Sequence, residues 1–195
     1  MNDLPLMTIP SPGDIPENAR LDFPLEQKEY LIAGELKVWQ GPMHEIRSPV
    51  FIKGPNGEER YLLGRTPAMT VEECMEALKG AAAAYSQGKG RWPTMSVGER
   101  ISHIETFAEK MKAVREDVVK LIMWEIGKTR EDSEKEFDRT MDYIRETLHA
   151  LKDLDRTSAR FLMEESIIGQ VRRSPLGIVL CMGPYNYPLN ETFAT

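Results

Sequence analysis

The fold of this chain is decided by one segment, Arg172-Arg173-Ser174-Pro175-Leu176-Gly177-Ile178-Val179-Leu180-Cys181-Met182-Gly183-Pro184-Tyr185-Asn186-Tyr187-Pro188-Leu189. Ser174 to Gly177 is typical of a turn, because proline fixes φ and glycine tolerates the conformations that follow it. Ile178 to Met182 carries no polar residue, which predicts a strand buried on both faces of a parallel sheet. Gly183-Pro184 then ends the strand, since proline cannot donate a hydrogen bond to a neighbouring strand.

Asn186 comes just after this predicted strand. Ligands of open α/β sheets bind beyond the carboxyl ends of the strands, so Asn186 is a candidate site residue. The same residues also fit a connection punctuated by prolines with an asparagine in its turn, and spacing alone does not separate the two interpretations. The sequence contains no Gly-x-Gly-x-x-Gly. The turn after this strand is therefore not expected to hold a pyrophosphate in the usual Rossmann manner.

The composition excludes several classes of protein. The 195 residues have 41% hydrophobic and 29% charged side chains, which is typical of a globular protein, and the net charge of -6 gives no basic footprint for nucleic acid. No apolar run reaches the roughly 20 residues of a membrane span, and residues 1–5 do not resemble a secretory signal, so we expect a cytoplasmic protein. Cys74 and Cys181 are predicted to be reduced and buried. No metal site is expected, because the histidines lack ligand spacing: His44, His103 and His149.

Strands are predicted first along the chain, followed by helices. The strands are separated by turns rich in glycine and proline: Tyr30 to Ile32, Glu35 to Trp39, Val50 to Ile52 and Tyr61 to Leu63. Two capping boxes, Thr70 with Glu73 and Ser96 with Glu99, predict the starts of two helices. Two more helices are predicted by apolar periodicity: Val118 to Ile126, ended by Gly127, and a long one with the stripe Phe137, Met141, Ile144, Leu148 and Leu151. Phe161 to Glu164 and Ile167 to Arg173 then form a predicted hairpin.

Several segments together resemble the aldehyde dehydrogenase superfamily. They occur in the family's order: Gly90-Arg91-Trp92-Pro93, Gly98-Glu99-Arg100, Glu125-Ile126-Gly127-Lys128, Glu134 to Ile144 with Asp138-Arg139-Thr140, and Pro175-Leu176-Gly177 through Gly183-Pro184-Tyr185-Asn186-Tyr187-Pro188. The resemblance runs from about Glu29 to the end of the chain. It is greatest to the non-phosphorylating, NADP-dependent glyceraldehyde-3-phosphate dehydrogenases. It implies an α/β fold, of which this chain is the amino-terminal part: short strands, a helix cluster, a projecting hairpin and the first Rossmann strand.

The resemblance also implies roles for residues. Met182, Gly183, Pro184 and Tyr185 would line the nicotinamide side of NADP or NAD. Asn186 would donate its side-chain N–H to the oxygen of the aldehyde, where thiolate attack creates negative charge. Tyr187 would contact a substrate phosphate. Arg139 would contact that phosphate or lie at the active-site entrance, although an exposed ion pair with Glu134, Glu136 or Asp138 explains Arg139 equally well.

The predicted organisation has four parts: an extended arm over residues 1–28, the start of a cofactor domain over 29–155, an oligomerisation hairpin over 156–174, and the first Rossmann strand with its loop over 175–195. The parent enzyme would be a cytoplasmic homo-oligomer, a homotetramer, that oxidises glyceraldehyde 3-phosphate to 3-phosphoglycerate in glycolysis. The family's nucleophilic cysteine and general-base glutamate are expected beyond Thr195, so this chain alone is expected to be inactive. A CoA-acylating aldehyde dehydrogenase and a non-catalytic interaction module remain as alternatives.

Overall fold

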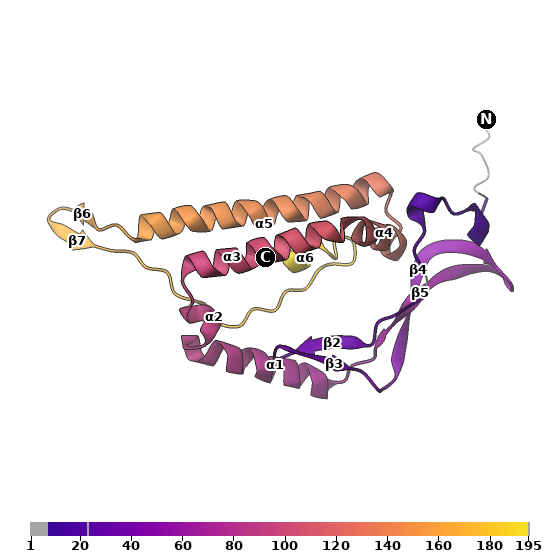
Figure 1. Ribbon diagram of the computed structural model, residues 1–195, viewed down its shortest axis with the longest axis horizontal. Coiled ribbons are helices and arrows are strands. Elements are labelled where there is room, and N and C mark those ends of the chain that lie inside the picture. The colour runs from indigo at the N-terminus through magenta and orange to yellow at the C-terminus, as the bar shows by residue number, and fades with distance from the viewer. Residues whose placement is uncertain (1–7, 23, 195) are drawn as a thin grey trace. The chain divides into compact units, whose positions relative to one another are not determined.

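The computed structural model describes residues 8–22 and 24–194, which form two compact units (Figure 1). The first unit contains the described residues up to Tyr30, together with Lys37–Met69 and Glu116–Lys135. The second contains Leu31–Leu36, Thr70–Arg115 and the described residues from Glu136 onward. Each unit is therefore assembled from segments far apart in the sequence.

The first unit is built on a three-stranded sheet. Strands β4 (Met43–Gly54) and β5 (Gly57–Pro67) are antiparallel, and the short β1 (Leu25–Glu26) pairs parallel with β5. Strands β4 and β5 are both longer than the strands predicted from the sequence. The residues at their ends are mostly polar and give no clear strand pattern. The register of β4 shifts between Arg47 and Phe51, where Pro49 has no N–H for the ladder.

The core of this unit joins the sheet to helix α4 (Arg115–Ile126). Ile15, Leu63 and Trp124 are buried together. The Trp124 Nε1–H donates to the Ala19 carbonyl at 2.6 Å, and the buried Ser48 hydroxyl donates to the Trp124 carbonyl. Gly127 ends α4 with a φ of 77°, as the sequence predicted. The amino-terminal segment adds two 3₁₀ turns, η1 (Pro12–Asp14) and η2 (Glu17–Ala19).

Helices dominate the second unit. Thr70 accepts from the Glu72 N–H, and Ser96 from the Glu99 N–H; both predicted capping boxes are confirmed. The helices are α1 (Val71–Tyr85), α2 (Arg91–Thr94), α3 (Val97–Ala113), α5 (Arg130–Ser158), which begins in the first unit, and α6 (Asn190–Phe193), with a 3₁₀ turn η3 (Ser86–Gly88). Four residues of the predicted apolar stripe of α5 are buried (Phe137, Met141, Ile144 and Leu148), and Leu151 is half-buried.

Two hairpins complete the structure. Strands β2 (Glu29–Ile32) and β3 (Glu35–Val38) form one two-stranded sheet. Strands β6 (Leu162–Glu164) and β7 (Ile167–Gly169) form the other, and Glu165 and Ser166 make its turn with positive φ. All six residues of β6 and β7 are exposed.

Two sequence predictions are wrong for the segment that precedes Gly183. Ile178 to Met182 forms no strand and is exposed, because no other strand among the described residues pairs with it. Cys181 is consequently exposed rather than buried. Cys74 is exposed as well, because the face of α1 that carries it has no covering layer among the described residues.

Candidate active site

The loop from Gly183 to Pro188 is closed by a backbone contact between its two ends. A Cβ on Gly183 would lie 2.6 Å from the Pro188 carbonyl oxygen and 2.6 Å from Thr192 Oγ1. No side chain fits there, since such distances lie well inside van der Waals contact. Between the ends, the Tyr187 N–H donates to the Pro184 carbonyl at 3.1 Å and forms a turn. Glycine at position 183 is therefore required by this close approach.

Asn186 occupies the turn of this closed loop. Its side chain is exposed, and among residues 8–22 and 24–194 it makes no hydrogen bond. The amide is thus held by the backbone on either side and remains available to donate. A neutral donor of this kind can stabilise an oxyanion without protonating it.

The far end of the loop is anchored on α5. Oε1 of Glu136 accepts the N–H of Leu189 at 3.1 Å and that of Asn190 at 3.4 Å. One helical turn further along α5, the Thr140 hydroxyl donates to the Glu136 carbonyl at 2.8 Å, and its Oγ1 lies 3.3 Å from Asn190 Oδ1. Glu136, Thr140 and Asn190 are all buried. A buried position is unusual for a carboxylate such as that of Glu136, and its two hydrogen bonds from the backbone compensate for the hydration that it loses.

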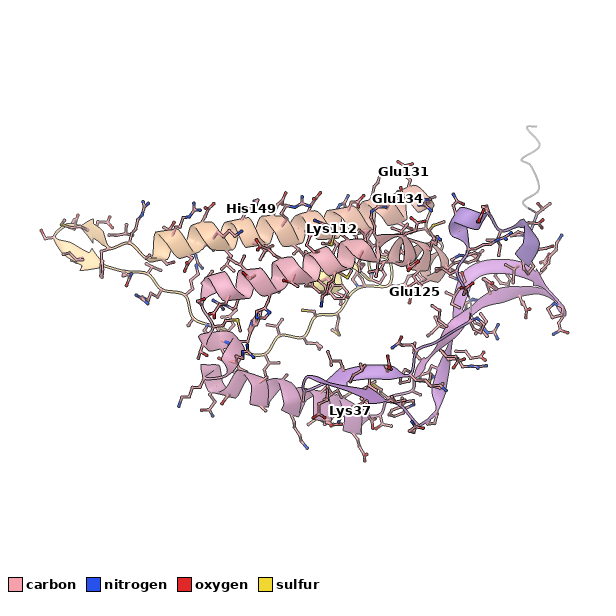
Figure 2. The ribbon with its side chains drawn as sticks, viewed as in Figure 1. Lys37, Lys112, Glu125, Glu131, Glu134 and His149 are labelled. Atoms are coloured by element: carbon pink, nitrogen blue, oxygen red, sulfur yellow. The ribbon has the colours of Figure 1, made fainter. Side chains whose placement is uncertain are left out.

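Arg139 lies on the same helical turn, between the two anchoring residues. The predicted ion pair is wrong: Glu134, in the first turns of α5 (Figure 2), pairs with Arg130, and Asp138 pairs with Arg115. In the described part of the chain Arg139 makes no hydrogen bond or ion pair, and it is exposed. The guanidinium of Arg139 is therefore unpaired, and it lies on the turn of α5 whose Glu136 binds Leu189 and Asn190.

The four residues predicted to contact a cofactor present an uncharged surface. Met182 and Tyr185 are exposed, and Gly183 and Pro184 between them bring the backbone close to the rest of the loop. Apolar side chains of this kind fit the face of a nicotinamide ring. None of the four side chains carries a charge.

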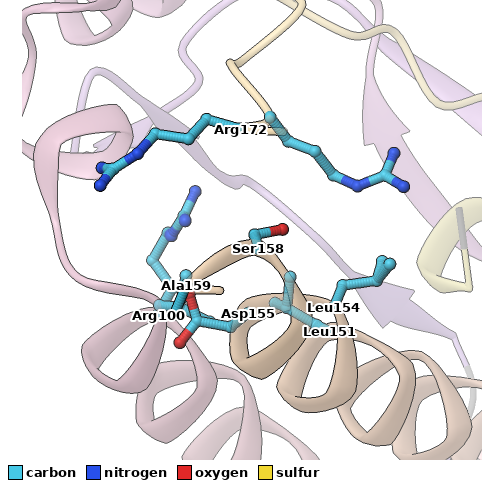
Figure 3. Close-up of a pocket in the computed structure, with 9 residues that line it drawn as sticks. Arg100, Leu151, Leu154, Asp155, Ser158, Ala159 and Arg172 are labelled. Atoms are coloured by element: carbon cyan, nitrogen blue, oxygen red, sulfur yellow. The ribbon is translucent and has the colours of Figure 1, made fainter. Parts of the chain in front are cut away.

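A separate pocket lies at the other end of α5 (Figure 3). It measures about 260 Å³ and is lined by Val97, Arg100, Leu151, Leu154, Asp155, Ser158, Ala159, Arg172 and Arg173. Nineteen residues of helix separate Glu136 from Asp155, roughly 28 Å. The lining includes three arginines and Asp155, at the carboxyl end of α5.

Neither thiol in the chain is placed for nucleophilic catalysis. Cys74 and Cys181 are free, and within the described residues neither is hydrogen-bonded to a base. Among the same residues no group of three histidine, cysteine, aspartate or glutamate side chains has the arrangement of a metal site. No helix among them is long and apolar enough to cross a membrane.

A sequence model of the aldehyde dehydrogenase family matches residues 53–194. The chain belongs to the aldehyde dehydrogenase family. The resemblance read from the sequence is confirmed, and so is the α/β fold that it implied.

Relatives of this aldehyde dehydrogenase chain have several specificities. A chloroplastic betaine aldehyde dehydrogenase of Atriplex hortensis is 28% identical over 173 residues, which cover 86% of this chain and 33% of the relative. A peroxisomal aminoaldehyde dehydrogenase 2 of Pisum sativum is 25% identical, with 87% and 33% covered. The chain thus spans about a third of the length of these relatives.

Solved structures share the fold. An NADP-dependent glyceraldehyde-3-phosphate dehydrogenase from Bacillus halodurans C-125, complexed with NADP, matches with a TM-score of 0.65 and 27% identity; the match covers 87% of this chain and 34% of that one. A betaine aldehyde dehydrogenase from Staphylococcus aureus, in complex with NAD+, has a TM-score of 0.66 at 22% identity and supports the fold alone; 86% of this chain and 32% of that one are covered.

The sequence of this aldehyde dehydrogenase chain predicts the loop but not the residues that hold it. It indicates Glu136 only as a possible partner for Arg139, and it gives no role to Asn190 in the site. One signal was available. Ser133, Glu136 and Thr140 recur at helical spacing beside the apolar stripe of α5, and polar residues on a buried face require partners.

Proposed function

We propose that the enzyme containing this chain oxidises an aldehyde to a carboxylate with NADP or NAD. The observation that carries the proposal is the closed loop that presents the unbonded amide of Asn186. In the proposed reaction a cysteine thiolate, supplied outside the described residues, adds to the aldehyde carbon and places negative charge on its oxygen. The Asn186 amide donates to that oxyanion.

The chain's own residues would also shape the space around the reacting carbon. The bound cofactor would accept the hydride, and water would then release the acid. Met182 and Tyr185 would cover the nicotinamide and exclude water, while Gly183 allows the loop backbone to approach. The relative whose structure contains NADP supports this cofactor class.

We propose glyceraldehyde 3-phosphate as the substrate, because the guanidinium of Arg139 could bind its phosphate. An exposed, unpaired guanidinium on the turn that anchors the loop is suited to a phosphate. The structural relative that is named for this substrate supports the choice. Betaine aldehyde is the second candidate, because curated relatives carry that name, but its cationic ammonium group would be repelled by Arg139.

Steady-state kinetics of the full-length enzyme test this function. We expect NADP reduction with glyceraldehyde 3-phosphate and no requirement for CoA. Arg139→Ala and Tyr187→Phe should raise KM for the phosphorylated aldehyde about tenfold or more and leave an unphosphorylated aldehyde unchanged, since each deletes a ground-state contact. Equal losses with both aldehydes would remove the phosphate role. A requirement for CoA would favour the acylating alternative.

The proposed enzyme is a cytoplasmic homo-oligomer. Both cysteines are free thiols, which suits a reducing compartment. The exposed hairpin of β6 and β7 supports oligomerisation, because a two-stranded hairpin is marginal in water without further strands. A fluorescent fusion of the full-length protein found in an organelle would contradict the location.

A further inference from the structure

We propose that Glu136 is a positioning residue that fixes Asn186 for catalysis. The inference rests on the proposed function, in which Asn186 donates to the oxyanion. Glu136 is only 3% exposed, and Oε1 of its carboxylate accepts two backbone N–H groups, from Leu189 and Asn190. These donors begin α6 and come three and four residues after Asn186.

The loop has two anchors, and Glu136 supplies the second. At the first, Gly183 packs against the Pro188 carbonyl, which also accepts the Thr192 hydroxyl at 2.7 Å. That anchor closes the loop on itself but does not attach it to the rest of the unit. Glu136 connects the closed loop to α5, and Asn190 also lies against α5, with its Oδ1 3.3 Å from Thr140 Oγ1.

The helix that carries Glu136 is held independently of the loop. Asp138 binds the Arg115 guanidinium through two hydrogen bonds of 2.9 and 2.8 Å, and Lys152 binds Glu105 on α3 at 2.9 Å. The segment after the loop has its own contact with α3, since Phe107 stacks on Phe193 at the end of α6, with ring centroids 5.6 Å apart. The buried side chains of Phe137, Met141 and Ile144 fix α5 in the unit, and the Glu136 carboxylate transmits the position of α5 to the loop.

The contact between Glu136 and the loop depends on the acceptor oxygen of its side chain and on where that oxygen lies. An ionised carboxylate accepts hydrogen bonds only, and Oε1 has lone pairs for both N–H groups. Glu136→Leu removes both acceptors and leaves two buried donors unpaired. Glu136→Gln keeps an acceptor oxygen in the same place, and Glu136→Asp moves the oxygen back by one methylene. Activity should therefore fall in the order Glu, Gln, Asp, Leu.

The first test uses this chain and needs no activity. Amide hydrogen exchange at Leu189 and Asn190 should accelerate at least tenfold in Glu136→Leu and stay close to wild type in Glu136→Gln. Glu146→Leu is the matched control, because Glu146 is an exposed glutamate on the same helix. Unchanged exchange in Glu136→Leu would overturn the proposal whatever the enzyme does.

The second test uses the full-length enzyme. Glu136→Leu should lower kcat about 10- to 100-fold, with less than threefold change in the KM of the aldehyde and in cofactor affinity. In the Asn186→Ala background the same change should cost less than threefold, because Glu136 acts through Asn186. An equally large loss in both backgrounds would overturn the positioning role. If Glu136→Leu does not fold, the kcat order of the Gln and Asp variants decides, and equal values would refute it.

The outcomes separate this inference from the function on which it rests. If Asn186→Ala leaves kcat unchanged, the oxyanion role fails, and positioning for catalysis fails with it. If Asn186→Ala lowers kcat while Glu136→Leu does not, the proposed function stands and only the positioning role is lost.

Discussion

At the scale of single residues, the loop from Gly183 to Pro188 is defined by the amide of Asn186 and by the absence of a side chain at Gly183. In the full-length enzyme, Asn186→Ala should lower kcat about 100- to 1000-fold, because the amide contacts charge that develops only after thiolate attack. Cofactor affinity should change little, since Asn186 is not among the residues assigned to the cofactor. Kinetics together with a cofactor-binding titration check this. A loss confined to KM would show that Asn186 acts in substrate binding instead.

Gly183→Ala tests the close approach within the loop. The new Cβ would lie 2.6 Å from the Pro188 carbonyl oxygen, so the loop must shift, and we expect kcat to fall by about 100-fold. Gly98→Ala is the matched control: nothing lies within 4 Å of its Cβ, and alanine favours the helix. Wild-type kcat in Gly183→Ala would mean that the loop tolerates this movement.

At the scale of elements, α5 is joined to the start of α4 by an ion pair. The Arg115 guanidinium, hydrogen-bonded to Asp138, lowers the pKa of that carboxyl. A lowered pKa in the folded state stabilises the fold above the unfolded pKa of about 3.9, and the effect is lost as the pH falls through the folded value. The Asp138 side chain is 57% exposed, so its contribution is less than about 1 kcal/mol.

Arg115→Gln should therefore lower the free energy of unfolding of the chain by less than about 1 kcal/mol at pH 7. The difference from wild type should shrink as the pH falls below about 3.9. Urea titrations at several pH values measure it. Arg145→Gln serves as the control, because its pair with Asp142 lies within one exposed turn of α5. A difference that persists at low pH would assign the effect of Arg115 to its packing on Phe137.

The sequence predicted elements well where the signal is local. The capping boxes, the Gly127 stop and the stripe of α5 depend on neighbours within two turns, and the structure confirms them. The strand predicted over Ile178 to Met182 is wrong, because a strand needs a partner strand and a local sequence pattern does not show whether one is present. Glu136 was missed for the same reason: its two donors are more than fifty residues away.

At the scale of the whole molecule, the hairpin should decide assembly. Met163 and Ile168 are directly paired across β6 and β7, and both are exposed. The double substitution Met163→Lys and Ile168→Lys should convert the full-length enzyme into smaller species in sedimentation velocity, because charges oppose burial at an interface. Leu31→Lys on β2, which is also exposed, is the control. An unchanged sedimentation coefficient would place the interface elsewhere.

The 195-residue chain alone should show no aldehyde dehydrogenase activity. Neither of its cysteines is hydrogen-bonded to a base among the described residues. Purified chain with glyceraldehyde 3-phosphate and NADP should form no NADPH, whereas the full-length enzyme should form it under the same conditions. NADPH formation that Asn186→Ala abolishes would contradict this, and Cys74→Ser and Cys181→Ser would then identify the thiol.

The exposed run from Ile178 to Met182 has a consequence for handling the protein. It combines β-branched and aliphatic residues, carries no charge or proline, and has no paired edge in the described structure. Such a run is a template for intermolecular β-pairing, and Pro175 and Pro184 bound it as gatekeepers. The isolated chain should therefore aggregate as its concentration rises, through pairing of this exposed run between molecules.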